Sequence, residues 1–379
     1  MGAGLYLHIP FCLRRCPYCA FFSTVCEGEV PSEYADALIR EMRMRKGEKE
    51  WPEMDTVYLG GGTPSLLSPR DLTRILQAVR DTFSVSDGAE ITLEGNPGTV
   101  DGDKLAAFIK AGVNRLSLGV QSFRDDTLNV LGRIHTAEHA VKAFQVARAA
   151  GFDNLSLDLM FGVPGETTEH WLETLRLALE LKPEHLSLYA LTVEEGTALK
   201  SAVFRGDIEI PSEDEQAEQC RMSSDLLREA GFIHYEVSNY CLPKKRSRHN
   251  WGCWTGKPYW GLGASAHSFD RRKRSWNVSD LADYTDRVLS GEDPTEGEEI
   301  LGESTGRFER ICLGLRTEKG VYLTQRERDY LLSSPQAKQW IEAAFVKATA
   351  SGIALTEEGF LRADALSVEV AEVFQGIVS

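Results

Sequence analysis

Six short apolar segments recur along the first half of the chain: LYLHIPF, VYLGGG, EITLEGNP, RLSLGVQ, NLSLDLMFG and HLSLYAL. The stretches between them, such as DLTRILQAVRDTF and AEHAVKAFQVARAA, place apolar residues at the i, i+3, i+4, i+7 spacing of amphipathic helices. Strand and helix alternating six times predict parallel strands joined by right-handed crossovers. The periodicity leaves open whether the strands form a barrel, complete or partial, or an open sheet covered on both faces.

Each predicted strand leads into glycine or polar residues, and in parallel α/β folds the chemistry gathers at the carboxyl ends of the strands. The first strand runs into a group of cysteines, and the second runs into Gly60 to Thr63. The next three carry Glu94 and Asn96, then Gln121, then Asp158. Any one of these is ordinary, because glycine and polar residues commonly end strands. Five such ends in succession predict one functional site at that edge.

The character of the chain changes near residue 232, where short aromatic and glycine-rich pieces replace the alternation. Beyond about residue 300, helical patterns precede GIALTEEGFLRAD, which predicts a hairpin with its turn at residues 357–359. We therefore expect a barrel over 1–231, a connecting region over 232–299 and a small winged-helix-like module over 300–379. The near-balanced charge of this last module favours packing or partner docking over DNA binding.

Composition narrows the class of protein. The chain is 42% hydrophobic and 26% charged, which is typical of a soluble globular protein, and no run approaches the ~18 apolar residues of a membrane helix. The start, MGAGLYLHIPF, lacks the basic region and cleavage site of a targeting peptide, so we expect a cytoplasmic protein. The net charge of -15 argues against nucleic acid as a partner, because such binding depends largely on Lys and Arg.

The eight cysteines include one tight cluster, Cys12, Cys16 and Cys19, within CLRRCPYC. This Cys-x3-Cys-x2-Cys spacing differs from the paired Cys-x2-Cys of structural zinc sites, and no His pair follows it, so zinc is the lesser alternative. Three thiolates suit an iron-sulfur cluster and leave one iron without a protein ligand, open to a small molecule. Cys26 is a weaker candidate for a fourth ligand, and three merely structural cysteines are the remaining alternative.

The cysteine motif and the later GGGTPS together resemble the radical S-adenosylmethionine superfamily. The resemblance implies that the cysteines hold a [4Fe-4S] cluster whose free iron binds S-adenosylmethionine. Further motifs, LYLHIPFC, YLGGGTPSLL, EGNPGT, RLSLGVQSF, LGRIH, DLMFGVPGET and LSLYALTVEEGT, occur in the order seen in the oxygen-independent coproporphyrinogen III dehydrogenase family. The implied fold is α/β, a partial (β/α)6 barrel followed by a smaller C-terminal α+β domain.

The resemblance also implies the site residues, with Cys12, Cys16 and Cys19 as cluster ligands. Those implied at S-adenosylmethionine are Tyr6, Tyr18, Gly61, Gly62, Thr63, Glu94, Gln121, Arg133 and Asp158. The glycines match a strand end where backbone approaches the methionine amine, which glycine permits because it lacks a Cβ. The polar residues match contacts to the ribose and the carboxylate. His8 and His135 belong to the same pattern but receive no role.

Two classes within this family must be separated. The dehydrogenases carry a further cysteine two places after the third, where this chain has Phe21. They also have an amino-terminal extension ahead of the cluster, whereas here the first cluster cysteine is residue 12. Both differences favour the related heme chaperones.

The segment SRHNWGCWTGKPYWGLGASAH resembles the H-N-x-x-Y-W stretch of radical S-adenosylmethionine heme chaperones, which bind heme and hand it to acceptors. His249 is then the implied heme-binding residue, because a neutral imidazole is a good axial ligand, and Trp251 and Trp254 offer flat apolar faces. The chain departs from the motif at Cys253, which replaces the tyrosine and leaves the heme ligand open. A structural histidine is the alternative for His249. The flanking runs KKRSRH and DRRKRS could pair with propionates, although solvated turns are favoured.

We therefore expect a cytoplasmic heme chaperone with heme and heme-accepting proteins as partners and its heme site within residues 232–299. Peripheral membrane association through the acceptors and a homodimer are left open. The alternative is an oxygen-independent coproporphyrinogen III dehydrogenase, in which a 5'-deoxyadenosyl radical would abstract hydrogen from a propionate.

Overall fold

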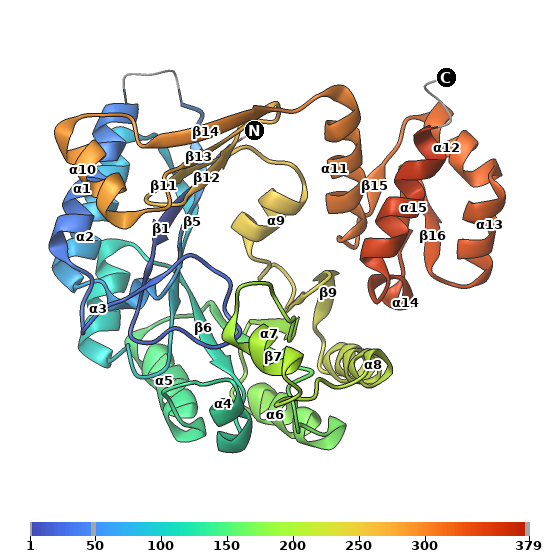
Figure 1. The fold of residues 1–379 in the computed structure, drawn as a ribbon, viewed down its shortest axis with the longest axis horizontal. Coiled ribbons are helices and arrows are strands. Elements are labelled where there is room, and N and C mark those ends of the chain that lie inside the picture. Colours follow the sequence, from blue (N-terminus) through green and yellow to red (C-terminus); the bar gives the residue numbers. More distant parts are fainter. Residues whose placement is uncertain (1, 47–50, 376–379) are drawn as a thin grey trace.

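The computed structural model describes residues 2–46 and 51–375. Its centre is a run of six adjacent parallel strands within one 12-stranded sheet (Figure 1). These strands are β1 (Ala3–Ile9), β4 (Met54–Gly61), β5 (Val85–Gly95), β6 (Arg115–Gln121), β7 (Leu155–Phe161) and β8 (His185–Ala190). The helices between them are α1 (Ser32–Arg45), α2 (Pro69–Thr82), α3 (Gly102–Ala111), α4 (Asp125–Val130), α5 (Ala137–Ala150) and α6 (Thr168–Glu180). The predicted α/β partial barrel is confirmed.

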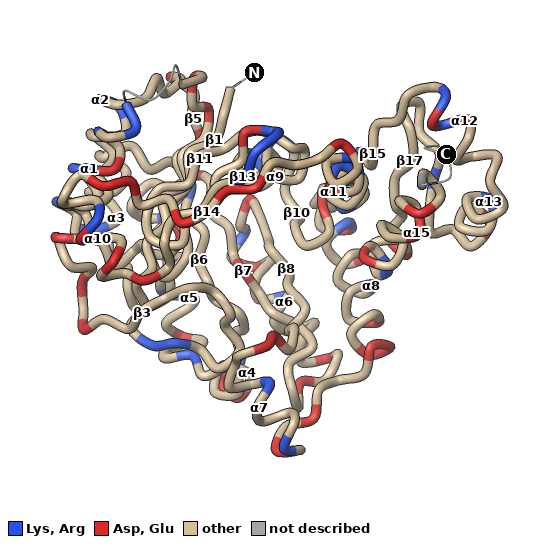
Figure 2. The backbone as a smooth tube through the Cα atoms, turned by 45° about the horizontal axis from the view of Figure 1, so that its top comes forward, with Lys and Arg blue, Asp and Glu red and all other residues tan. Residues whose placement is uncertain are grey.

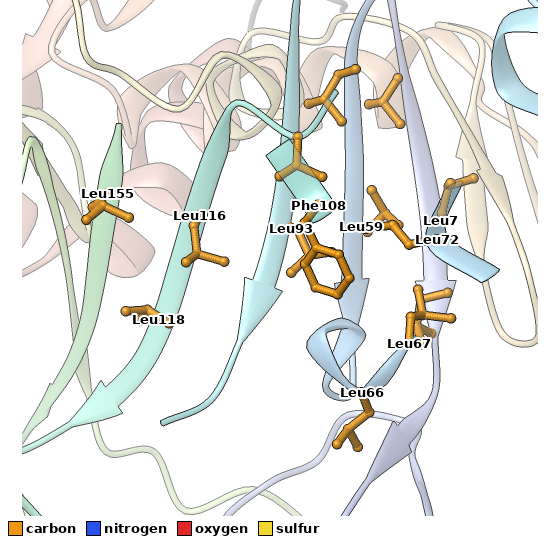
Figure 3. Close-up of a cluster of buried hydrophobic side chains, with 14 of the residues drawn as sticks. Leu7, Leu59, Leu66, Leu67, Leu72, Leu93, Phe108, Leu116, Leu118 and Leu155 are labelled. Atoms are coloured by element: carbon orange, nitrogen blue, oxygen red, sulfur yellow. The ribbon is translucent and has the colours of Figure 1, made fainter. Parts of the chain in front are cut away.

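Alternation along the strands separates an apolar face from a polar one. On β6, Leu116 and Leu118 are fully buried and lie toward the helices, while Ser117 between them points the other way and reaches Asp158. Figure 3 shows Leu116 and Leu118 on the same side as Leu155 of β7, with Phe108 of α3 beside Leu93 of β5. The polar face lines the barrel interior, so the same strands that build the core also supply the groups for chemistry.

Residues 233–300 extend both edges of this sheet. On one edge β11 (Tyr259–Leu262) pairs parallel with β1, and β12 (His267–Phe269), β13 (Lys273–Asn277) and β14 (Thr295–Ile300) continue antiparallel. On the other, β10 (Asn239–Cys241) and β9 (Ile233–Glu236) follow β8. The short helix α9 (Arg248–Trp254) connects the two edges (Figure 1). The change of character near residue 232 is therefore not a break in the sheet.

Two further helices, α7 (Ala198–Phe204) and α8 (Glu213–Glu229), follow β8, and α10 (Leu281–Ser290) packs beside α1. Figure 2 shows acidic and basic positions along the outer helices, α1 and α8 among them. Among the helices of the described residues, none combines the length and the apolar character needed to cross a bilayer.

The C-terminal module has its own apolar core and its own three-stranded sheet, β15-β17-β16. Its elements are α11 (Glu303–Leu315), β15 (Val321–Tyr322), α12 (Gln325–Ser333), α13 (Pro335–Glu342), β16 (Val346–Thr349), β17 (Gly352–Leu355), α14 (Glu357–Phe360) and α15 (Ala363–Gln375). Helix, strand, two helices and a hairpin give the expected winged-helix-like order. The predicted turn at 357–359 is wrong: the hairpin turns between β16 and β17. Residues 357–359 begin a helix instead, because the Thr356 hydroxyl accepts a hydrogen bond from the Gly359 N–H as an N-cap.

The module contacts the barrel through α14. Arg221 of α8 holds the Glu358 carboxylate through both a 2.7 Å and a 2.9 Å bond, and His234 of β9 lies 2.6 Å from Glu357. The His234 ring also stacks on Tyr240, with centroids 4.0 Å apart. Charged and aromatic contacts therefore join the module to the last strands of the sheet.

Candidate functional site

The three clustered cysteines lie on the loop that follows β1. Cys12 ends β2 (Phe11–Cys12), which pairs with β3 (Thr24–Val25), and Cys16 and Cys19 lie between these strands. The Cys19 N–H donates to Cys16 O at 3.2 Å, and the Cys26 N–H donates to Cys12 O at 2.9 Å. Burial raises the pKa of the Cys19 thiol, and the nearby Cys16 and Cys12 raise it further. The loop therefore gathers three free thiols into one half-buried place.

The sulfur atoms of the three clustered cysteines do not point together as metal ligands would. Among residues 2–46 and 51–375, no group of three or more His, Cys, Asp or Glu side chains is arranged to hold a metal ion. The chemistry of the donor set nevertheless fits a thiolate-bound cluster, because three soft donors share a short loop that is open on one side. Cys26 lies on the same loop, with its thiol 3.7 Å from Gly28 O.

The glycine-rich end of β4 packs directly against this loop. The Gly62 N–H donates to Ile9 O at 3.0 Å, and the Thr63 N–H donates to Phe11 O at 2.7 Å. A Cβ on Gly62 would lie 2.6 Å from Phe11 O, and one on Gly61, whose φ is +110°, would meet the His8 ring. The Thr63 hydroxyl lies 3.5 Å from the Cys12 sulfur. Glycine is required here because two backbone segments approach too closely for any side chain.

Glu94 and Asp158 point into the barrel from β5 and β7. The Glu94 carboxylate accepts hydrogen bonds from the Tyr58 hydroxyl at 2.6 Å and from the Gly61 N–H at 3.1 Å. Burial raises the pKa of Glu94 to about 7. Asp158 accepts from the Ser117 hydroxyl at 3.1 Å, and burial raises its pKa too. Burial in the interior therefore disfavours the charged form of both carboxylates.

Arg133 and Gln121 lie beside the cysteine loop and keep unused polar atoms. Arg133 donates to Gly119 O at 2.7 Å, contacts the Asn96 side chain, and lies 3.5 Å from the Cys16 sulfur. Within the described part of the chain, Arg133 Nε and Gln121 Oε1 are buried without a hydrogen-bond partner. Gln121 also has a φ of +67°, a strained conformation that functional sites often contain.

A small hollow opens beside these groups. Its lining includes Cys16, Thr63, Asn96, Arg133 and His135. We call this carboxyl-end edge, which carries the cysteine loop, residues 60–63, Asn96, Gln121 and Arg133, the rim. Its unpaired guanidinium nitrogen and amide oxygen fit a ligand that carries a carboxylate and hydroxyl groups.

The two predicted tyrosines lie in different places. Tyr6 lies inside the barrel, where its hydroxyl is 2.9 Å from His8 Nδ1 and its ring stacks on Tyr58. Tyr18 belongs to the cysteine loop, packs beside the apolar cluster around Leu131 and has its pKa raised by burial. Only Tyr18 is therefore beside the cysteines.

His249 lies on α9 inside the barrel and is 6% exposed. Its Nδ1 is 3.0 Å from the Thr56 hydroxyl, and its ring stacks on Tyr58 at 5.0 Å and on Tyr6 at 6.3 Å. Burial lowers its pKa to about 3, so the imidazole is neutral. Cys253, on the same helix, has its pKa raised by burial to about 11.

The Trp251 ring packs beside Tyr235, with centroids 6.0 Å apart. Arg246 and Lys319 lie over the Trp251 ring, 5.0 Å and 5.3 Å from its centroid. Tyr259 of the predicted heme segment contacts the His249 ring instead, with centroids 6.4 Å apart.

Sequence reasoning missed three polar residues of the interior: Tyr58, Thr56 and Arg115. Tyr58 binds Glu94, Thr56 contacts His249, and Arg115 opens β6 with a fully buried side chain. The signal was present, because Arg115 occupies a polar position of the alternating segment RLSLGVQ and therefore shares a face with Ser117 and Gln121.

Comparison with known proteins finds one superfamily model and several similar heme chaperones. The family model of the radical SAM superfamily matches residues 6–178. The heme chaperone HemW of Mycobacterium tuberculosis is 38% identical over 85% of this chain and 83% of its own length, and that of Bacillus subtilis is 34% identical over 98% of both. HemW of Escherichia coli is 40% identical over 70% of this chain and 69% of its own.

Among solved structures, the radical SAM enzyme coproporphyrinogen III oxidase (HemN) of Escherichia coli superimposes with a TM-score of 0.81. The match covers 98% of this chain and 90% of that one at 23% identity. At that identity the likeness shows a common fold alone.

Proposed function

The chain belongs to the HemW family of heme chaperones within the radical SAM superfamily, and from this premise we propose that it binds heme and transfers it to acceptor proteins. The observation that carries the proposal is the identity of 34–40% with HemW proteins over most of the chain. The superfamily implies a [4Fe-4S] cluster and S-adenosylmethionine as cofactors. The location in the cytoplasm, the identity of the acceptors, membrane contact through them and a homodimer stay predictions.

Cys12, Cys16 and Cys19 would hold the cluster. When bound, the cluster supplies an iron open to the amino and carboxylate groups of S-adenosylmethionine and a source of one electron. Hydrogen bonds from the Gly62 and Thr63 N–H groups hold the start of the cysteine loop against the end of β4. The protein thereby keeps the thiols close together. Arg133, 3.5 Å from the Cys16 sulfur, lowers the cost of several thiolates in one place.

The rim supplies matching groups for S-adenosylmethionine. The peptide edge of Gly61 and Gly62 gives close backbone access to an amine, and Arg133 Nε is a free donor for the carboxylate. Gln121 Oε1 is a free acceptor for a hydroxyl such as those of the ribose. Glu94 and Asp158 lie below, where their hydrogen bonds hold Tyr58 and Ser117 in place.

His249 is the residue that we propose as heme ligand. The contact between Nδ1 and the Thr56 hydroxyl fixes the ring, and no described residue bonds to Nε2. A neutral imidazole with one nitrogen held by the protein and the other free is the usual form of an iron-ligating histidine. Tyr6 and Tyr58, stacked on it, would border the macrocycle.

The alternative, an oxygen-independent coproporphyrinogen III dehydrogenase, has less support. The likeness to the Escherichia coli enzyme is one of fold. Phe21, at the position where that family has its further cysteine, is 70% exposed and contributes no thiol.

One set of measurements on anaerobically reconstituted protein separates the two functions. We expect hemin to bind, as followed by the Soret band, and to pass to an apo-cytochrome. We expect no protoporphyrinogen from coproporphyrinogen III with reductant and S-adenosylmethionine, and its formation would refute the chaperone proposal.

His249→Ala tests the proposed ligand. We expect weaker hemin binding and an altered Soret position, because an axial ligand is lost. His170→Ala, an exposed histidine of α6, is the matched control. Unchanged binding in the His249 variant would remove this residue from the heme site while leaving the chaperone function standing.

A further inference from the structure

Arg115 is a buried cation that points into the lower half of the barrel. It opens β6, is 1% exposed, and lies on the same strand face as Ser117, whose hydroxyl reaches the interior residue Asp158. Its partner in the strand register is Thr92 of β5, which is fully buried. The two side chains therefore lie next to each other on the interior face.

Both side chains carry polar atoms without partners. Among the residues that the structure describes, Arg115 forms no ion pair and its Nε has no hydrogen-bond acceptor. The Thr92 hydroxyl also has no partner there. Burying an unpaired guanidinium is costly unless an anion compensates it, so two adjacent orphan donors indicate a ligand with acceptor oxygens.

The interior carboxylates do not fill that role, because each is held by other groups. Glu94 accepts from Tyr58 and Gly61, and Asp158 accepts from serine hydroxyls. Glu90 accepts from the N–H groups of Arg248 and His249, at 3.0 Å and 3.1 Å, at the start of α9.

Glu236, the fourth interior carboxylate, accepts from the Ser238 N–H at 3.2 Å and binds the Asn239 side chain. Neutral donors thus bind all four of these carboxylates. Arg115, the cation near them, has no anionic partner among the described residues.

The barrel interior also has accessible surface of its own. Tyr189 of β8 shares a strand face with the inward-pointing Ser187 and His185. It is 39% exposed, although burial by the surrounding protein raises its pKa strongly. Its register partner on β7 is Met160, so this accessible surface lies near the carboxyl ends of the strands, above the level of Arg115. We call the lower interior, lined by Thr56, Thr92, Arg115 and His249, the floor.

We propose that Arg115 and Thr92 form a carboxylate-binding site on the floor, and that its ligand is a propionate of the heme that His249 holds; this inference rests on the proposed function. A guanidinium fork with a neighbouring hydroxyl matches the two oxygens of a carboxylate. The other carboxylate at hand, that of S-adenosylmethionine, belongs at the rim. Gln121 there lies six residue steps along β6 from Arg115, about 20 Å at roughly 3.3 Å per step.

The test compares hemin with hemin dimethyl ester, which has the same ring and no propionate charge. The purified, reconstituted full chain is titrated with each and the Soret band is followed. The unsubstituted protein is expected to bind hemin at least about ten-fold more tightly than the ester, as for a charge-assisted hydrogen bond. Arg115→Gln is expected to lose this preference by weakening hemin binding alone. Arg176→Gln, an exposed arginine on α6, is the matched control.

Each outcome decides between the sources of the carboxylate. If the Arg115→Gln variant keeps the full preference for hemin over its dimethyl ester, the inference is overturned, while the proposed function stands. A loss of S-adenosylmethionine affinity with unchanged hemin binding would assign the site to the cofactor and overturn it equally. If the unsubstituted chain binds neither porphyrin, the proposed function itself fails. If Arg115→Gln does not fold, Arg115→Lys decides: it keeps the charge but not the fork, so it is expected to keep only part of the preference.

Discussion

The rim and the floor of the barrel are built in opposite ways. At the rim, backbone N–H groups of Gly62 and Thr63 fasten the cysteine loop, and an open hollow lies beside it. At the floor, side chains from strands and from α9 meet in the buried interior, where Arg115 and Thr92 keep orphan donors. One barrel therefore combines an open edge that carries three thiols with a buried interior that carries unpaired hydrogen-bond donors.

The two regions also differ in how they handle charge. The rim places Arg133 against the thiols, so its charges compensate each other within a few ångströms. In the interior, burial instead suppresses the charge of titratable side chains: the pKa of His249 on the floor falls to about 3, and that of Glu236 rises to about 8. We therefore expect the largest effect, loss of the cluster, when a thiol of the rim is replaced. We expect substitutions in the interior to change how the free energy of unfolding depends on pH.

The largest expected effect is at the rim. Cys16→Ser should abolish the cluster, because a hydroxyl replaces one of three thiolate ligands. Iron and sulfide content and the visible absorption after anaerobic reconstitution measure this. Cys312→Ser, in the C-terminal module, should leave the cluster intact. A full complement of iron in the Cys16 variant would show that the rim does not hold the cluster.

The second prediction concerns the pH dependence of stability and tests the interior. Glu236 is fully buried, and burial raises its pKa from about 4.5 to about 8. Between these values the folded state holds a proton that the unfolded state has released, so stability falls as the pH rises from 4.5 through 8. Glu236→Gln removes this loss and should stabilise the protein above pH 8, on the order of 3 to 5 kcal/mol, relative to the unsubstituted chain.

Urea unfolding at pH 5, 7 and 9, followed by circular dichroism, measures the difference. Glu169→Gln, an exposed carboxylate on α6, serves as control and should keep the original pH profile. Parallel profiles for the Glu236 variant and the unsubstituted chain would show that the interior does not disfavour charge as we describe.

The smallest expected effect concerns the backbone contact between Gly62 and the cysteine loop. Gly62→Ala places a Cβ against Phe11 O and should destabilise the fold by about 1 to 3 kcal/mol through overpacking. Because the cysteine loop carries the displaced backbone, cluster content after reconstitution should fall as well. Gly88→Ala on β5, where a Cβ meets nothing within 4 Å, is the matched control. Equal melting temperatures and iron contents in the two variants would contradict this fastening.

Much of the fold and of the rim could be predicted because the signals are local. The six apolar segments became the six central parallel strands, since side-chain alternation and amphipathic spacing are properties of neighbouring residues. The hairpin turn at 357–359 was wrong for a local reason too: a Thr N-cap before Glu-Glu-Gly starts a helix and does not turn a hairpin.

The interior below the rim could not be predicted in the same way. His249 meets Thr56, 193 positions earlier in the chain, only because α9 packs inside the barrel. The alternation of RLSLGVQ places Arg115 on the interior face, but nothing local reveals that no carboxylate of residues 2–46 and 51–375 pairs with it. That depends on how Glu90, Glu94 and Asp158 are each satisfied by other elements.

The sequence by itself therefore determined the parallel α/β architecture, the cysteine loop and the glycine edge beside it. These depend on residues that are close in the chain, where spacing translates directly into geometry. Only the tertiary structure decided that β9 to β14 extend the same sheet and that His249 lies among Tyr6, Tyr58 and Thr56. It also decided that Arg115 is buried with no anionic partner in the part of the chain that the structure describes. The physical reason is that burial and pairing of a polar group are set by all the segments that surround it, and those segments come together only when the chain folds.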